Sequence, residues 1–130
     1  MNAVTMEGIK AAITESAADN GAQCRIANPQ EDKSLYEMAY DAVSHGDANV
    51  YMDEMSYDDF AKSAYLPAYI TMDGQTLLVE AYIGTDGVEY CAVLVKENGE
   101  ESDMMEMVVN KPQDHGDMVD VFDSIIMGLN

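Results

Sequence analysis

The sequence predicts an α+β fold in which N-terminal helices and a C-terminal helix pack on a four-stranded antiparallel β-meander. The sheet is indicated by three turn pairs, Asp73-Gly74, Asp86-Gly87 and Asn98-Gly99, at intervals of 13 and 12 residues. Asp-Gly and Asn-Gly pairs between apolar runs are typical of β-hairpins. The residues before and after this region show apolar side chains at helical spacing instead. A chain of 130 residues is the size of one domain, which divides by pattern into a mainly helical part (1–65), an antiparallel sheet (68–109) and a C-terminal helix (117–129).

Three helices are expected in the N-terminal half. The first covers about residues 4–18 and ends at Asn20-Gly21; one face carries Met6, Ile9, Ile13 and Ala17. The second begins with Asn28 as N-cap and Pro29 at its first position, and it ends at the turn 45–47. Its apolar stripe consists of Leu35, Met38, Ala39, Ala42 and Val43. Ser56 and Asp59 form a capping box for a short third helix through Ala64, which Pro67 closes.

Four strands follow from the turn pairs, over residues 69–72, 75–84, 88–97 and 104–109. The last helix carries one apolar face, made of Met118, Val121, Phe122, Ile125, Ile126 and Leu129. We expect the helices to cover one face of the sheet. The opposite face would then remain partly uncovered, with Leu78, Tyr82, Cys91, Val93 and Val95 on it.

The charge of the chain is strongly one-sided, with 25 Asp and Glu against 6 Lys and Arg and a formal net charge of −19. Like-charge repulsion destabilises a compact state, so a function must favour keeping it. Such a protein is repelled by nucleic acid and by anionic lipid, and direct binding to either is not expected. Residues 1–20 lack the apolar core of a secretory signal, and Cys24 and Cys91 lack metal-ligand spacing. Reduced thiols and a cytoplasmic location are therefore expected.

Catalysis is not expected from this sequence. His45 and His115 both stand in His-Gly-Asp turns, where a histidine is usually solvated, and no nucleophile elbow, phosphate loop or dinucleotide fingerprint occurs. Cys91 lies among apolar residues in the middle of a predicted strand, which is typical of a small buried thiol. Neither a calcium loop nor a zinc-binding histidine pair is present. We expect a protein without enzymatic activity, cofactor or metal.

The acidic residues form three groups. The first is a C-terminal row with a spacing of three, made of Asp114, Asp117, Asp120 and Asp123. Another surrounds the last hairpin and contains Glu97, Glu100, Glu101, Asp103 and Glu106. The third is interleaved with tyrosines and methionines, which makes it the preferred partner-binding region, consisting of Asp41, Asp47, Tyr51, Asp53, Glu54, Tyr57, Asp58 and Asp59. The alternative to partner binding is that each group is a solvated face, or that the acidic residues reflect adaptation to high salt.

Short stretches of the chain resemble two families of inhibitors that imitate DNA. The run Leu35–Val43, followed by Val50–Met55, resembles a helical segment of the Ocr and ArdA antirestriction proteins. Glu89–Val95 with its turn, and Tyr65–Ile70, resemble strand segments of the uracil-DNA glycosylase inhibitors. That family touches its target through an acidic-Ser-apolar segment. Its matches here are Lys33-Ser34-Leu35, where lysine replaces the acid, and Glu15-Ser16.

These resemblances imply an inhibitor from a phage or mobile element, acting in the cytoplasm of its host cell. Together with the charge, they predict a DNA mimic that binds the basic surface of a DNA-binding protein or nuclease. A restriction enzyme, a CRISPR effector and a uracil-DNA glycosylase are the candidate targets. The alternative is an acidic adaptor that forms a homodimer through its sheet, without nucleic-acid mimicry.

Overall fold

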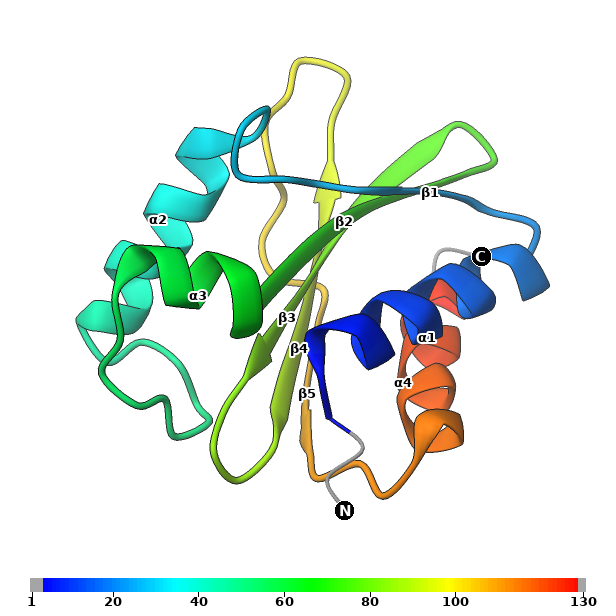
Figure 1. Ribbon diagram of the computed structural model, residues 1–130. Coiled ribbons are helices and arrows are strands. Elements are labelled where there is room, and N and C mark those ends of the chain that lie inside the picture. The colour runs from blue at the N-terminus through cyan, green and yellow to red at the C-terminus, as the bar shows by residue number, and fades with distance from the viewer. Residues whose placement is uncertain (1–3, 129–130) are drawn as a thin grey trace.

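The computed structural model describes residues 4–128, which form four helices and a five-stranded antiparallel sheet (Figure 1). The elements are α1 (Met6–Asp19), β1 (Gln23–Ile26), α2 (Lys33–Ser44), α3 (Tyr57–Ser63), β2 (Tyr65–Met72), β3 (Gln75–Ile83), β4 (Val88–Val95), β5 (Glu106–Asn110) and α4 (His115–Met127). The strands lie side by side in chain order, so the predicted α+β class and the meander are confirmed. The prediction of four strands is wrong by one, because β1 was not expected.

Helices cover both faces of the sheet, which corrects the prediction that they cover one. Figure 1 shows α1 and α4 on one side of the strands, with α2 and α3 on the other. Leu77 and Val79 of β3 pack with α1 and α4, whereas Tyr65 of β2 packs with α2 and α3. Tyr65 stacks on Phe60 with 5.2 Å between ring centroids. Two cores form because the strands carry large apolar side chains on both faces, so each face needs a cover.

The face predicted to stay partly uncovered is covered over part of its area. Leu78 and Cys91 are only 2% and 5% exposed, whereas Tyr82, Val93 and Val95 are partly exposed. Ala42 and Val43 of α2, together with Met104, line the small cavity that remains over Cys91. A homodimer through this face stays a prediction.

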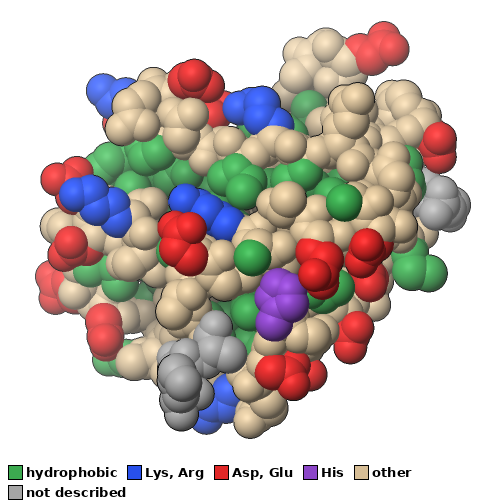
Figure 2. All heavy atoms as spheres, turned by 45° about the vertical axis from the view of Figure 1, so that its right-hand side comes forward, with side chains coloured by type: hydrophobic (Ala, Val, Ile, Leu, Met, Phe, Trp, Pro, Cys, Tyr) green, Lys and Arg blue, Asp and Glu red, His purple; other side chains and the backbone are tan. Residues whose placement is uncertain are grey.

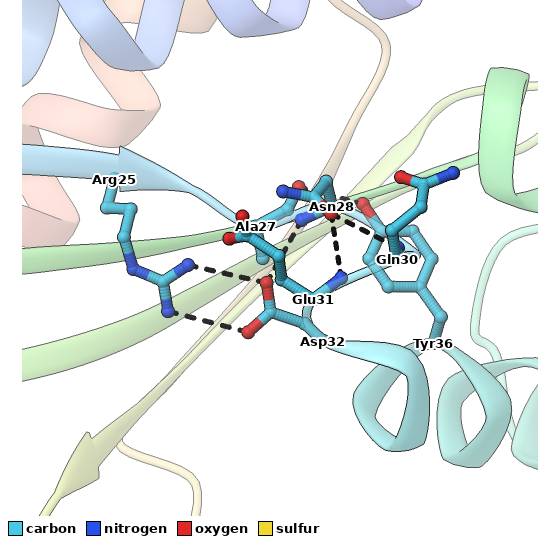
Figure 3. Close-up of polar contacts among 7 residues, drawn as sticks. All are labelled: Arg25, Ala27, Asn28, Gln30, Glu31, Asp32 and Tyr36. Atoms are coloured by element: carbon cyan, nitrogen blue, oxygen red, sulfur yellow. Dashed lines mark hydrogen bonds and ion pairs between the residues drawn. The ribbon is translucent and has the colours of Figure 1, made fainter.

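The start of α2 differs from the prediction. Asn28 does not cap the helix; its side-chain oxygen accepts from the backbone N–H groups of Gln30 and Glu31, at 3.1 and 2.9 Å (Figure 3). A turn stabilised in this way separates Asn28 from α2, which begins at Lys33 after Asp32. Asp32 in turn accepts from the Asn28 N–H at 3.1 Å and from the Arg25 guanidinium at 3.3 Å. Asn28 forms an Asx turn here, a structure that competes with helix capping.

The apolar stripe of α2 is also shifted. Met38 is 71% exposed, and Tyr36 takes the buried position at 3%. The buried face of α2 differs from the predicted one because α2 packs beside the aromatic residues of α3 and β2. There the Tyr36 ring packs edge-on against Tyr65, with 5.1 Å between ring centroids.

Pro67 lies inside β2 instead of ending the preceding helix. β1 pairs with β2 up to Ile26 and Ala68, and beyond that pair the Ala27 N–H donates to the Pro67 carbonyl at 3.0 Å. Proline has no N–H to return to the Ala27 carbonyl. The hydroxyl of Tyr36 donates to that carbonyl instead, at 3.0 Å. A proline is tolerated here because it stands beyond the last paired residue of β1.

The turn pairs have different roles in the fold. Asp73 and Gly74 both have positive φ, 53° and 79°, as a two-residue hairpin turn requires. Gly87 has no positive φ; a Cβ there would lie 2.6 Å from the carbonyl oxygen of Asn110, so β5 passes too close for any side chain. Gly99 forms a turn with φ 85°, but the chain then runs irregularly to β5 at Glu106.

The other helix boundaries follow local capping rules. Ser56 caps α3 by accepting from the Asp59 N–H at 3.2 Å, as predicted, and Thr5, which was not predicted, caps α1. α4 begins at His115 and not at 117, because Asp114 caps it by accepting from the Asp117 N–H at 2.9 Å. The predicted core position Leu129 lies outside the described residues. In the part of the chain that the structure describes, no helix has the length and apolar character to cross a membrane.

Candidate functional site

The predicted partner-binding carboxylates between α2 and α3 are all exposed. Two shallow hollows, both lined by Tyr40 and Ser44, adjoin each other on this surface. Asp53 and Glu54 lie at one hollow and Asp41 at the other. We call these three carboxylates, with Asp58 and Asp59 in the first turn of α3, the α2–α3 acidic surface.

Asp47 is placed apart from this surface. It lines the cavity over the sheet that also contains Glu80, Glu89 and Cys91. The sequence grouped Asp47 with its neighbours in the chain, but the connection between α2 and α3 turns it toward the sheet side.

The aromatic side chains of this region mostly serve the core. Tyr36 is buried, and the Tyr40 hydroxyl donates to the carbonyl of Met55 at 2.6 Å. Tyr57 is half-buried and packs edge-on against Tyr40, with 5.6 Å between ring centroids. Tyr51 is the exception at 66% exposed, held by its backbone contacts to the β3–β4 loop. The surface therefore offers many charges and few exposed aromatic anchors.

One histidine modulates the charge of this surface. His45 Nδ1 lies 2.7 Å from the Asp41 carbonyl oxygen and 3.6 Å from its carboxylate. These contacts raise the pKa of His45, because both favour the protonated ring. A protonated His45 would partly neutralise Asp41 in mildly acidic solution.

The C-terminal acidic row is largely used within the fold. Asp114 caps α4, and Asp117 accepts from the Gln113 N–H at 2.7 Å. Asp123 accepts from the Ser16 hydroxyl at 2.5 Å and from the Asn20 amide at 3.0 Å, which links α4 to α1. Asp120 is the exposed member without such a role. The row is therefore a weak candidate for binding a partner.

A second surface, at the β5 edge, combines charge with exposed apolar side chains. The exposed fractions of Met104, Met105, Met107 and Val109 are 56, 49, 46 and 47%. The exposed carboxylates of Glu97, Glu100, Glu101, Asp103 and Glu106 belong to the same stretch of chain. We call this combination the β5 surface. Within residues 4–128, β5 pairs with β4 alone and is an edge strand, whose other side has no strand partner in this range.

These carboxylates and the strand were predictable from the sequence, but the exposure of the methionines was not. The alternation Met105-Glu106-Met107 was the available signal. It could not be interpreted without knowing that β5 is an edge strand, where neither face is fully covered.

Few of the carboxylates are neutralised within the protein. Among residues 4–128, ion pairs within 4.0 Å involve Glu7, Glu15, Asp32 and Asp41, and two of these have histidine as the partner. In the same range no group of three His, Cys, Asp or Glu side chains is placed to hold a metal ion. The surface field is therefore negative over wide areas.

Buried acids stand between the sheet and α2. The Tyr65 and Tyr82 hydroxyls donate to the Glu80 carboxylate, and the Asn49 backbone N–H donates to Glu89 at 2.6 Å. Burial raises the pKa of Glu80, and the two tyrosine hydrogen bonds oppose part of that rise. Burial and the neighbouring Glu89 raise the pKa of the Cys91 thiol to about 12, so it is a poor nucleophile.

Comparison with known proteins identifies no relative of this chain. No protein-family model, characterised protein or solved structure matches the chain, so its resemblances to antirestriction proteins and glycosylase inhibitors remain predictions.

Proposed function

We propose that the protein is an acidic inhibitor that occupies the basic nucleic-acid-binding surface of a DNA-processing or defence enzyme in place of DNA. The observation that carries the proposal is the β5 surface, where exposed methionines and exposed carboxylates occur along one stretch of chain in a protein of net charge −19. Carboxylates attract the Lys and Arg side chains that would otherwise contact phosphates, and they speed association.

Apolar anchors decide which acidic surface holds the partner. Specific affinity depends on side chains that lose water on binding, whereas charges at the rim mainly change the association rate. Met107 and Val109 lie two residues apart on β5, so both project from the same face of the strand. Methionine also adapts to irregular partner surfaces. We therefore assign anchoring to the β5 surface and electrostatic steering to the α2–α3 acidic surface.

The homodimeric adaptor is the less favoured function. Its predicted interface, the second face of the sheet, is partly covered by α2, with Leu78 and Cys91 buried. Pairing of two β5 edges would bring two chains of net charge −19 together, and like-charge repulsion opposes that association.

The proposal is tested with three purified enzymes: a uracil-DNA glycosylase, a restriction enzyme and an RNA-guided nuclease. We expect the protein to bind at least one of them, to be displaced by duplex DNA, and to bind more weakly as salt concentration rises. Absence of binding to all three, or binding that saturating DNA does not reduce, would contradict the proposal.

Three double charge reversals locate the anchoring surface. Glu101→Lys with Asp103→Lys changes the β5 surface, and Asp53→Lys with Glu54→Lys changes the α2–α3 acidic surface. Asp19→Lys with Asp120→Lys is the matched control, since both carboxylates are exposed and the net charge changes equally. We expect the β5 pair to accelerate dissociation most, the α2–α3 pair to slow association, and the control to do least. Equal effects of all three pairs would mean that net charge alone governs binding.

A further inference from the structure

The basic residues of this acidic protein are unevenly placed. Three of the six, Lys10, Lys33 and Lys62, line one cleft of about 490 Å³ between α1, α2, α3 and β2. Figure 2 shows several basic side chains in the upper left of the visible face, with hydrophobic and acidic side chains among them. A single carboxylate, that of Asp58, lines the cleft. The lining of the cleft therefore carries more basic than acidic side chains.

Two of these lysines form no ion pair within the described residues. Lys10 lies 3.7 Å from Glu7, but Lys33 and Lys62 are in no ion pair with any residue of 4–128. Lys62 is in the last turn of α3, where the helix dipole favours a cation. Lys33 is the first residue of α2, where a cation is disfavoured and no acidic residue occupies the first turn. Helix stability therefore does not account for Lys33.

The N-terminus of α2 beside the cleft is uncapped. No side chain accepts a hydrogen bond there, and the backbone N–H groups of Lys33 and Ser34 make none within the described chain. Asp32, the residue before the helix, is held by Arg25 and by the Asn28 N–H, as Figure 3 shows. Free N–H groups and the positive end of a helix dipole favour an anion.

The interior of the cleft provides an apolar floor. Ala27, Tyr36 and Leu66 are buried residues that line it. The half-buried Tyr57 is also among the lining residues. The volume falls within the range of small-molecule sites, about 300–1,000 Å³.

We propose that this cleft binds a small phosphate-bearing ligand with a flat or apolar body, of nucleotide size. The phosphoryl group lies between Lys33, Lys62 and the α2 N-terminus, and Lys10 adds a third cation. A phosphoryl group has enough oxygens to meet several donors at once, whereas a monocarboxylate has fewer. The apolar body rests on the floor formed by Tyr36 and Leu66. This site adjoins the α2–α3 acidic surface at Asp58, but it uses the lysines and the α2 N-terminus, so the proposal stands whether or not the protein inhibits an enzyme.

The test is calorimetric titration of the full chain with AMP, ADP, adenosine and inorganic phosphate at constant ionic strength. We expect ADP and AMP to bind more tightly than phosphate or adenosine alone. Absence of binding tighter than about 1 mM for both nucleotides would overturn the proposal. Equal binding of adenosine and AMP would overturn the role of the lysines, and equal binding of phosphate and AMP that of the apolar floor.

Matched lysine variants separate a site from a general charge effect. Lys33→Gln with Lys62→Gln should weaken nucleotide binding by about tenfold or more, because two charged donors are lost. Lys96→Gln with Lys111→Gln removes the same charge from exposed lysines outside the cleft and should leave binding unchanged. Equal weakening by both pairs would overturn the proposal. Thermal melting of each variant without ligand checks that the fold is kept.

Discussion

Replacing Tyr36 by phenylalanine removes a hydroxyl whose role depends on a proline elsewhere in the chain. That hydroxyl donates to the Ala27 carbonyl at 3.0 Å, in the position where a strand partner would supply an N–H. The partner is Pro67, which accepts from the Ala27 N–H but has no N–H to return. Ala27 and Tyr36 are both 3% exposed, so water cannot take over the donor role in Tyr36→Phe without rearrangement.

The expected cost follows from an unsatisfied buried carbonyl. Such a group costs about 1–3 kcal/mol, and the phenyl ring retains the packing against Tyr65. For 130 residues the entropy of unfolding near the midpoint is roughly 0.27 kcal/mol/K, so the melting temperature should fall by roughly 4–11 °C. Calorimetry and urea titration measure the two quantities. Tyr51→Phe is the control, since this side chain is 66% exposed, and should change the free energy of unfolding by less than about 0.5 kcal/mol.

A double-mutant cycle tests the cause. Pro67→Ala restores an N–H opposite the Ala27 carbonyl, so Tyr36→Phe should cost at least about 0.5 kcal/mol less in that background. If Tyr36→Phe costs the same with proline and with alanine at position 67, the hydroxyl does not substitute for the missing N–H and the reasoning is refuted.

Three further outcomes are expected. Ser56→Ala should lower the free energy of unfolding, measured by urea titration, by about 1 kcal/mol, because Ser56 caps α3. The control Ser34→Ala, at an exposed position, should not lower it. Equal effects of the two variants would contradict the capping role. Burial raises the pKa of Glu80 in the folded state above the ordinary 4.5, so the folded protein keeps a proton on Glu80 that the unfolded chain releases. The contribution of Glu80 to the free energy of unfolding therefore falls as pH rises from 4.5 through the raised pKa. Glu80→Gln lacks that loss, so the variant should gain stability relative to the parent between pH 4.5 and neutrality; a constant difference would refute the assignment. Cys91 is 5% exposed, and burial raises the pKa of its thiol to about 12. Iodoacetamide should therefore modify Cys24 first and Cys91 only after unfolding, as measured by mass spectrometry. Equal rates of modification would contradict the burial of Cys91.

Some elements were predictable because short segments decide them. Ser56 and Asp59 form a cap from residues three apart, and Asp73-Gly74 closes a hairpin through its own backbone angles. The strands on either side of that turn repeat apolar residues over their full length. In each case the determining interactions lie within a few residues of one another.

Other elements depend on contacts between distant residues. β1 is four residues long and carries a weak pattern, so it is defined by pairing with β2. The α2 boundary depends on Arg25, which holds Asp32 and leaves Asn28 to stabilise a turn. The second core arises only when Tyr65 meets the rings of Tyr36 and Phe60.

The sequence by itself determined the charge of this protein, its α+β class and the stretches of chain that carry its carboxylates. The tertiary structure alone decided which carboxylates are free. Asp123 is engaged with Ser16, Asp47 turns toward the sheet, and the methionines beside Glu106 remain exposed because β5 has a neighbour on one side only. Composition sets the sign of the surface field, which depends on the sum of the charges. Exposure depends on which elements pack together, and that is settled between residues far apart in the chain.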